Sequence, residues 1–541
     1  MFRFPSMKKP ISSFAVLAFF ISLLAIGVSI YKDFGVPTDD PAQAQIAVWN
    51  HRYIFKGDPT LLTFKDRYYG ATFELPLLWI QSRFANPNKL FTRHFILYLA
   101  FLVSLVILYF LSRRLFRNPW WGLLTVILLA ASPRIYTDAF YNSKDIPFME
   151  MFILAVGTLV LFFDTLKKKR SGLVTWALLG VHALTSGLLI GTRIAGIAII
   201  PISIILLVAV EWGSHKTWKH GLAAILIYLT LTAGFTVLFW PILWHDPLGE
   251  FINAFQQMSK YNVYGKAVLY LGQYVGSDAL PWHYLPVWIG ISTPLVVLAG
   301  LLPGTLDWIR SAVEVIRAGV RSKLTGFAEA VSDPETLGWL AVIGWLVIPV
   351  AAIYWFHSVL YNGWRQMYFI YPPLLLLSTR GFLALYRWFV RLTGRPFLVK
   401  LVTLLVLAVG LAEAVGFMIR YHPNEYLYFN QLAGDPATLR QRFELDYWGL
   451  SYKQAIDYIL AHDPSNAIRL FVADPPGLDY IYTALVPQSK SRLVIVENQD
   501  DNINYFVGDF LFHPSDYFTN KPEYYSITVH GTKIIVVYHI H

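Results

Sequence analysis

Two adjacent carboxylates, Asp39 and Asp40, follow the first long apolar run of the chain by a few residues. A carboxylate where a helix leaves lipid for water can serve as a general base, which contributes roughly 10²–10⁴ to the rate of a reaction. The pair could instead cap the next helix, because Asp is a favoured N-cap residue and Pro41 suits a first helical turn. The two roles are compatible. A two-carboxylate metal site is also possible, but no other residue pattern supports it, so we predict no metal ligands.

Further polar residues fall in segments that we expect on the same side of the membrane as this pair. Lys144, Arg193 and Arg365 are the cations, and Arg suits a phosphate group through bidentate hydrogen bonds. Each has a simpler interpretation as a solvated interfacial anchor, and Asp145 with Pro147 could simply cap a helix. The candidates for binding substrate hydroxyls or for orienting the base are Asp138, Asp145, Glu74, His245 and Tyr361.

Several other chemistries lack their sequence signature. The chain has no cysteine, which excludes disulfides, thiolate zinc sites and cysteine nucleophiles. It contains neither GxxxxGK[ST] nor HExxH, so a P-loop ATPase and a zinc protease are not supported. The net charge of +10 could suggest nucleic acid, but Lys and Arg also collect on the cytoplasmic loops of membrane proteins. We therefore predict no nucleic-acid partner and no cofactor, with a metal requirement left open.

Composition indicates a polytopic α-helical membrane protein. Of the 541 residues, 56% are hydrophobic and 14% are charged, whereas a soluble protein carries about 25% charged residues. Trp and Tyr, which favour membrane interfaces, number 18 and 32. Residues 11–31 are too long an apolar run for a signal peptide and predict a retained helix with an inside N-terminus. With this run, we expect eleven spans, at 11–31, 94–112, 119–133, 146–163, 173–191, 194–211, 220–243, 285–303, 337–356, 367–387 and 397–419.

The distribution of basic residues supports this count. When the chain is threaded through the membrane from an inside N-terminus, every basic cluster falls on the inner side, as the positive-inside rule requires. One missed span would break this agreement. The outer side then receives the loop 33–92 and everything after residue 420. The clusters are Arg113 to Arg117, Lys167 to Arg170, Lys216 with Lys219, Arg310 to Lys323, and Arg387 to Arg395.

Two outer segments have structure of their own. In the loop 33–92, residues 41–55 and 73–85 are amphipathic and suit helices that lie at the interface. The tail has mixed patterning, so we expect a transmembrane domain over 1–420 and an extracytoplasmic α/β domain over 421–541. The tail is predicted to hold a helix at Ser451–His462 and strands at Ile468–Val472, Arg492–Glu497, Tyr505–Phe510 and Lys533–Tyr538.

With this topology, four strings make the chain similar to the GT-C glycosyltransferases. The resemblance is to the family 39 type, the group of protein O-mannosyltransferases and aminoarabinose transferases of lipid A. Within this type, the resemblance is to the bacterial members. Thr38-Asp39-Asp40 resembles the acidic signature of that family's first outer loop. Asn142-Ser-Lys144-Asp145-Ile-Pro147 resembles its second-loop motif. Leu360 to Arg365 and Phe443 to Gly449 resemble more local signatures of the bacterial group.

The resemblance implies a sugar donor linked to polyprenyl phosphate and an inverting transfer on the outer face of a bacterial plasma membrane. The acceptor would be a hydroxyl on a protein, lipid or glycan. Asp39 matches the general base and Asp40 its acidic neighbour, although many relatives have Glu at the second position. Around the leaving phosphate we expect Arg193, Lys144 and Arg365, with Arg193 at the depth of a lipid phosphate because it opens a span.

Two other classes remain as hypotheses. A transporter or flippase for a lipid-linked or polar substrate would also have many spans and intramembrane carboxylates. Transporters often have internal repeats and helices broken at the midplane, and neither is evident in the sequence. A non-catalytic membrane module that acts through its outer domain would be insensitive to replacement of Asp39 and Asp40, except in stability.

Overall fold

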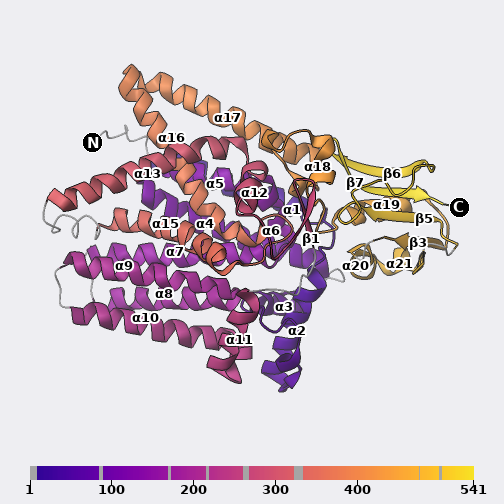
Figure 1. Cartoon of the computed structure of the whole chain (residues 1–541), viewed down its shortest axis with the longest axis horizontal. Coiled ribbons are helices and arrows are strands. Elements are labelled where there is room, and N and C mark those ends of the chain that lie inside the picture. Colours follow the sequence, from indigo (N-terminus) through magenta and orange to yellow (C-terminus); the bar gives the residue numbers. More distant parts are fainter. Residues whose placement is uncertain are drawn as a thin grey trace.

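The computed structural model describes residues 9–540 apart from 85–88, 168–171, 215–217, 260–266, 322–332, 474–475 and 499–501. Its long helices run side by side, and a small sheet domain lies beyond one end of the bundle (Figure 1). Within these described ranges, ten helices are long and apolar enough to cross a membrane, or eleven if one bent pair is counted as a span. The predicted class, a polytopic helical membrane protein with a C-terminal α/β region, is confirmed. The basic residues predicted at 168–170, 216 and 323 lie outside the described residues.

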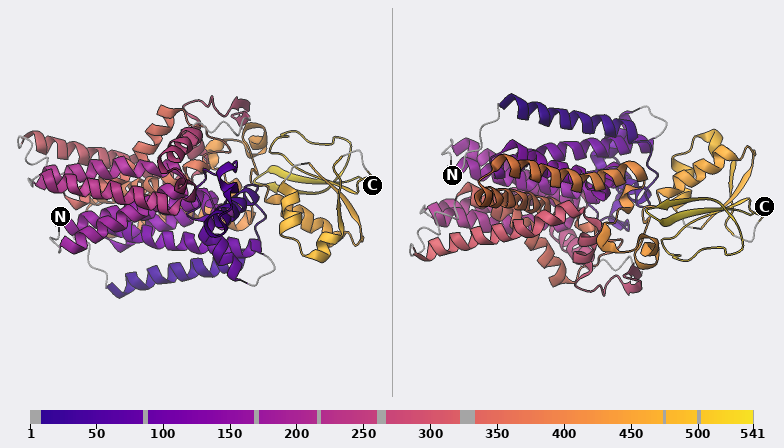
Figure 2. Two further views of the ribbon diagram at one scale, coloured as in Figure 1. Left: turned by 90° about the horizontal axis from the view of Figure 1, so that it is seen from below. Right: turned by 90° about the horizontal axis from the view of Figure 1, so that it is seen from above.

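The spanning helices share an apolar composition and differ in how deeply they are buried. α7 is enclosed by neighbours, whereas α1 lies along the outside of the bundle, as the view from above in Figure 2 shows. These helices are α1 (Lys9–Ile30), α4 (Lys89–Phe116), α7 (Asp145–Lys167), α8 (Gly172–Thr192), α9 (Ile199–Ser214), α10 (Trp218–Phe239), α13 (Leu295–Arg321), α15 (Pro334–Phe356), α16 (Tyr371–Thr393) and α17 (Pro396–Tyr421).

Two predicted spans are broken by proline. The run 119–133 becomes α5 (Pro119–Ala130) and α6 (Pro133–Tyr141), which meet at an angle of 71°. The run 285–303 becomes α12 (Tyr284–Ser292) followed by α13, with Pro294 at the break. A residue before proline avoids the helical region, so these helices end there. α5, at roughly 18 Å, is too short to span alone, and α6 is buried along almost its whole length.

The first loop forms α2 (Asp40–Lys56) and α3 (Glu74–Arg83), with a 3₁₀ turn, η1 (Pro59–Thr63), between them. In Figure 1, α2 runs across the direction of the spans, at the end of the bundle nearest the sheet domain. Exposed Phe55 and Trp79 from the two helices are in contact, with ring centroids 5.5 Å apart and the ring planes tilted by 46°. The predicted amphipathic helices are therefore present, and their exposed aromatic residues suit a membrane interface.

The C-terminal region contains a five-stranded sheet in the order β4-β3-β5-β7-β6. β3 is parallel to β4 and β5, and β7 is antiparallel to β5 and β6. Four strands were predicted; the edge strand β6 was missed because its half-exposed residues lack a clear alternation. The elements are α19 (Ser451–His462), β3 (Ile468–Val472), α20 (Pro476–Thr483), α21 (Pro487–Ser491), β4 (Leu493–Ile495), β5 (Tyr505–Asp509), β6 (Glu523–Val529) and β7 (Thr532–His539).

Short elements lie between the spans and after the last one. They include a hairpin of β1 (Ala267–Tyr270) and β2 (Gln273–Gly276), whose turn residues Leu271 and Gly272 both have positive φ, as a tight hairpin requires. The others are η2 (Ile194–Ala198), η3 (Pro241–Trp244), α11 (Pro247–Ser259), η4 (Arg365–Ile370), η5 (Glu425–Leu427), η6 (Gln431–Ala433), η7 (Pro436–Thr438) and α18 (Leu439–Arg442).

The segment before the sheet is fastened to the first loop. The Thr38 backbone N–H donates to the Trp448 carbonyl at 3.0 Å, and the Thr38 hydroxyl donates to the Tyr447 carbonyl at 3.0 Å. Nearby, His422 Nε2 lies 2.9 Å from Asp33 Oδ2. These contacts place the acidic pair of the first loop against residues that follow the last span.

Candidate active site

Asp39 stands at the N-cap position of α2, but its side chain makes no capping hydrogen bond. Its Oδ1 accepts a hydrogen bond from the Tyr447 hydroxyl at 2.8 Å. Its Oδ2 lies 3.3 Å from Arg365 Nη2 and 3.9 Å from Lys144 Nζ. The capping hypothesis is therefore wrong for this side chain, which belongs to a cluster of charges instead.

The second oxygen of Asp39 keeps its capacity to accept a proton. Within the described part of the chain, Oδ2 receives no hydrogen bond, although two cations lie within 4 Å of it. The Asp39 side chain as a whole is 21% exposed, against 3% for that of Arg365. A general base needs an available lone pair, and Oδ2 offers one, although this oxygen atom is itself buried.

The surroundings of Asp39 keep it ionised. Burial by itself would raise its pKa, but the charges of Arg365 and Lys144 and the Tyr447 hydrogen bond outweigh burial and hold the pKa below its usual range. The carboxylate is thus present as the base form at neutral pH. An anion that neutralised these two cations would weaken their hold and make Asp39 more basic.

Asp40 points to a different set of partners. Its Oδ1 lies 2.5 Å from Nε of Arg93, in the first turn of α4. The Arg93 Nη2 also donates to both Glu74 oxygens, at 2.8 and 2.9 Å, and to the Ser143 hydroxyl at 2.6 Å. Arg93 therefore joins the first loop, α3 and the second loop. Glu74, predicted near the substrate, is a member of this buried ion cluster.

Asp145 bridges two of the predicted cations. Its Oδ1 lies 2.7 Å from Arg193 Nη1, and its Oδ2 accepts a hydrogen bond from Arg365 Nη1 at 2.8 Å. The turn before α7 is made by another residue, because Asn142 Oδ1 accepts from the backbone N–H groups of Lys144 and Asp145. The capping alternative for the Asp145 side chain is therefore wrong, and the carboxylate holds the two arginines together.

The backbone explains how the two arginines reach this place. Arg193 is an extended residue between α8 and η2, so its side chain leaves the end of a span. Arg365 follows a turn in which Asn362 and Gly363 have positive φ, at 55° and 74°. Its guanidinium carbon lies 4.5 Å from the Tyr447 ring centroid and 4.8 Å from that of Trp448. Such stacking fixes the guanidinium without consuming its hydrogen-bond donors.

The remaining predicted residues differ in their positions. Asp138 accepts hydrogen bonds from the Tyr141 hydroxyl at 2.8 Å and from Asn142 at 2.9 Å, and borders a cavity of about 40 Å³ that Arg365 also lines. Tyr361 is buried, with its ring centroid 5.4 Å from the Arg365 guanidinium carbon. His245 is exposed beside η3 and shares no hydrogen bond or ion pair with the cluster in the described ranges.

Two residues that contact the acidic pair, Arg93 and Tyr447, were not singled out from the sequence. Arg93 was left just outside the predicted span 94–112, where a charge at the membrane boundary is easily read as an anchor. Tyr447 lies in the string Phe443 to Gly449, but nothing in that string indicates that its hydroxyl reaches a residue 408 positions earlier. Among the described residues, no group of three His, Cys, Asp or Glu is arranged to hold a metal ion.

Comparisons with known proteins give distant structural similarity. No protein-family model matches the chain, and no curated protein sequence matches it. ArnT from Cupriavidus metallidurans in the apo state is 13% identical with a TM-score of 0.48, over 97% of this chain and 98% of that one. The same enzyme bound to undecaprenyl phosphate gives a TM-score of 0.44 at 13% identity, over the same shares of the two chains.

A second similar structure is the archaeal oligosaccharyltransferase AglB from Archaeoglobus fulgidus, in complex with an inhibitory peptide and a dolichol-phosphate. It is 12% identical with a TM-score of 0.45, over 91% of this chain and 69% of that one. Identities and TM-scores at this level do not establish a shared function. The functional conclusion therefore rests on the geometry of the cluster.

Proposed function

We propose that this chain is an inverting glycosyltransferase that moves a sugar from a polyprenyl-phosphate donor to an acceptor hydroxyl. The observation that carries the proposal is Asp39, an ionised carboxylate whose Oδ2 accepts no hydrogen bond among the described residues, placed beside Lys144 and the Arg365–Asp145–Arg193 array. A base and a group of cations are the two requirements for transferring a glycosyl group from phosphate to a hydroxyl. They lie at the ends of spans, the depth at which a lipid phosphate is found.

The transfer takes place in one displacement. The acceptor oxygen attacks the anomeric carbon, the bond from that carbon to the phosphate oxygen breaks, and the acceptor proton passes to Asp39 Oδ2. The polyprenyl phosphate leaves with the bonding electron pair and gains negative charge. One displacement inverts the anomeric centre.

The cations lower the barrier to this departure. Fixed donors aimed at developing charge need no reorganisation during the reaction. Lys144, Arg365 and Arg193 carry three positive charges, of which Asp39 and Asp145 offset two. As the phosphate gains charge it draws Lys144 and Arg365 away from Asp39, so the base strengthens while the leaving group departs. Asp138 and Tyr361 border the same array and are proposed to contact the sugar or the acceptor.

The orientation of the chain in the membrane is proposed from the kind of donor that these residues suit. Nucleotide sugars are not expected outside the plasma membrane, so a donor carried by a lipid suits an active site on the outer face. The tail after residue 420 and the first loop would then be outside, in agreement with the basic clusters on the opposite side. The acceptor would be a hydroxyl of a protein, lipid or glycan that reaches the end of the bundle.

The test uses the full chain in proteoliposomes, with polyprenyl-phosphate mannose and polyprenyl-phosphate aminoarabinose as donor probes. Release of polyprenyl phosphate is followed in the presence of a cell-envelope extract as the acceptor. Asp39→Asn should lose at least about 10²-fold in turnover, the contribution of a general base, while still binding polyprenyl phosphate. Turnover that survives in both Asp39→Asn and Asp40→Asn would refute the base assignment. Accumulation of intact lipid-linked sugar in sealed vesicles, without a covalent product, would support the transporter hypothesis instead.

A further inference from the structure

A cavity of about 610 Å³ lies at the end of the bundle opposite to the active site. Two helices connect the two places. α4 carries Arg93 of the active site in its first turn and Arg113 near its last, about 20 residues or roughly 30 Å away. α7 begins with Asp145 and reaches the cavity with Asp164. The cavity therefore belongs to the opposite membrane surface and shares no side chain with the catalytic cluster.

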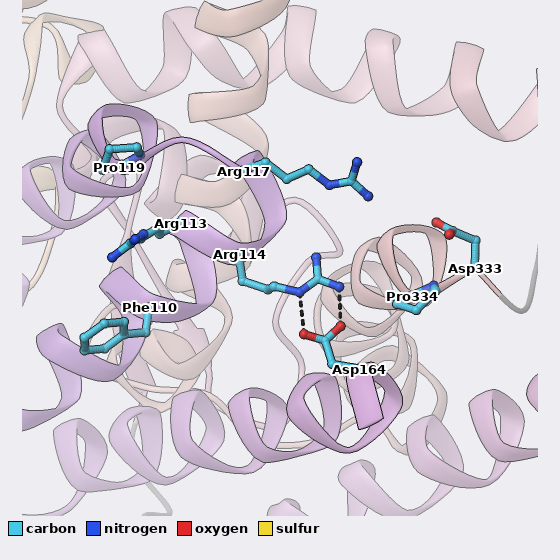
Figure 3. Close-up of a pocket in the computed structure, with 8 residues that line it drawn as sticks. All are labelled: Phe110, Arg113, Arg114, Arg117, Pro119, Asp164, Asp333 and Pro334. Carbon is cyan, nitrogen blue, oxygen red and sulfur yellow. Dashed lines mark hydrogen bonds and ion pairs between the residues drawn. The ribbon is translucent and has the colours of Figure 1, made fainter. Parts of the chain in front are cut away.

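The lining is basic on one side and apolar on the other. Three arginines from the end of α4 face it, and two acidic residues border it. In Figure 3 the pair of Arg114 and Asp164 lies between Arg113, on the side of Phe110 and Pro119, and Arg117, which points toward the side of Pro334. The lining residues are Phe110, Arg113, Arg114, Arg117, Pro119, Asp164, Asp333 and Pro334.

The acidic residues are already occupied by other groups. Arg114 donates through Nε and Nη2 to both oxygens of Asp164. Asp333 caps α15, since its Oδ2 accepts from the backbone N–H groups of Glu335 at 3.0 Å and Thr336 at 3.4 Å. Neither carboxylate is therefore free to neutralise Arg113.

The two outer arginines are available to a ligand. Arg113 is exposed and has no ion pair among the described residues. Arg117 pairs with Glu335 at 2.9 Å, but both side chains are about half exposed, at 57% and 43%, and pairs of this kind contribute little free energy. Arg113 and Arg117 thus both line a cavity whose volume is in the range of small-ligand sites, with their guanidinium groups on opposite sides of the Arg114–Asp164 pair.

The backbone holds these arginines in a fixed arrangement. Arg117 has φ of 52°, which turns the chain sharply out of α4. Asn118 then caps α5 by accepting from the backbone N–H of Trp120 at 2.9 Å. Gly122 on α5 lies so close to α4 that a Cβ there would be 2.8 Å from the backbone nitrogen of Arg113. The backbone of this wall of the cavity is thus set by a close helix pair.

An apolar surface runs from the cavity along the outside of α4. Phe110, one of its walls, is 57% exposed, and Val103 and Val106 on the same helix are 60% and 36% exposed. These residues are three and four positions apart and so share one helix face. An acyl chain can lie on this face while a headgroup enters the cavity.

We propose that this cavity is a binding site for a phosphate-bearing anion, and that Arg113 and Arg117 are its ligands. The apolar face of α4 favours the headgroup phosphate of an anionic phospholipid over a free phosphate. The inference does not depend on the proposed glycosyl transfer, because the site lies at the other end of α4.

The test is native mass spectrometry of the purified full chain with added dioleoyl-phosphatidylglycerol, dioleoyl-phosphatidylcholine or inorganic phosphate. Phosphatidylglycerol should bind at a saturable site, and Arg113→Gln should weaken it about fivefold, the contribution expected of one arginine at a membrane surface. The matched control is Arg391→Gln, the same change at an exposed arginine near the end of α16.

The outcomes separate the two sources of phosphate. Arg113-dependent binding of phosphatidylglycerol, with weaker binding of phosphatidylcholine, supports the lipid. Arg113-dependent binding of inorganic phosphate alone supports a soluble phosphate ligand. Equal binding in the wild type and Arg113→Gln, or equal weakening in Arg113→Gln and Arg391→Gln, overturns the proposal. Thermal melting of each variant shows whether it is folded.

Discussion

The Tyr447 hydroxyl donates a hydrogen bond to Asp39 Oδ1 at 2.8 Å and accepts one from Arg365 Nη2 at 2.9 Å. The tyrosine thereby holds one carboxylate oxygen in place and leaves the other without a hydrogen bond. It also stands between the base and the cation that would meet the leaving phosphate. A residue beyond the last span thus positions a residue just after the first one.

Tyr447→Phe tests this positioning. The ring and its stacking on Arg365 are retained, but Asp39 loses its hydroxyl donor. A hydrogen bond to a charged group is worth about 1.5–3 kcal/mol, so turnover should fall roughly 10–100-fold with little change in the apparent affinity for the donor. The measurement is turnover and KM in proteoliposomes, with Tyr458→Phe in the tail as the control. A variant with unchanged turnover would mean that Asp39 needs no such support.

Arg93→Gln should act on stability. The guanidinium is 4% exposed and pairs with both Asp40 and Glu74. Removing one partner of a buried ion pair costs about 3–5 kcal/mol, because it leaves the opposite charge uncompensated. We expect a lower melting temperature in detergent, and partial recovery when Glu74→Gln is added. If the double variant melted no higher than Arg93→Gln alone, the uncompensated carboxylate would not be the cause.

His422 links stability to pH. Burial lowers its pKa, but the hydrogen bond and charge of Glu425 and the contact with Asp33 outweigh burial and raise the pKa to about 8. A raised pKa in the folded state contributes stability that is fully present below pH 6.5 and is lost as pH rises through about 8. Melting temperature should therefore fall between pH 6.5 and 8.5, and this fall should be smaller in His422→Gln. The same fall in both proteins would assign the effect to another group.

Glu444 also links stability to pH, and the substitution Glu444→Gln can test this link while keeping the hydrogen bond from the Asn362 backbone. Burial raises its pKa to about 7, so its contribution is present below pH 4.5 and is lost as pH rises through about 7. Its carboxylate accepts from the Asn362 backbone N–H at 3.1 Å, which an amide oxygen can also do. Glu444→Gln should stabilise the protein at pH 8 by about 1–3 kcal/mol and have little effect at pH 5.

The control for this prediction is Glu497→Gln, the same change at an exposed carboxylate of the tail. The difference in melting temperature between this variant and the wild type should be the same at pH 5 and pH 8. A Glu444→Gln variant that is stabilised equally at pH 5 and pH 8 would show that ionisation is not responsible.

The amino-acid sequence by itself determined the class of protein, most of the spans, and helix α19 with four of the five strands of the tail. These depend on local properties: long apolar runs, basic residues at one side, and the periodicity of helix α19 and strand β3. Where local signals were interrupted, at Pro133 and Pro294, the predicted spans were broken in the structure. The sequence also identified Asp39, Lys144, Arg193 and Arg365 as candidates for the active site, because charged residues near membrane depth are costly and few.

Only the tertiary structure decided how these residues combine. It separated Asp39 from Asp40, turning one toward Arg365 and the other toward Arg93, although the two are neighbours in the chain. It brought Tyr447 to Asp39 and left His245 exposed. The reason is that hydrogen bonds and ion pairs depend on side-chain directions and on contacts between distant segments, such as that of Thr38 with Trp448. Neither is encoded in spacing along the sequence, so each had to be read from the folded chain.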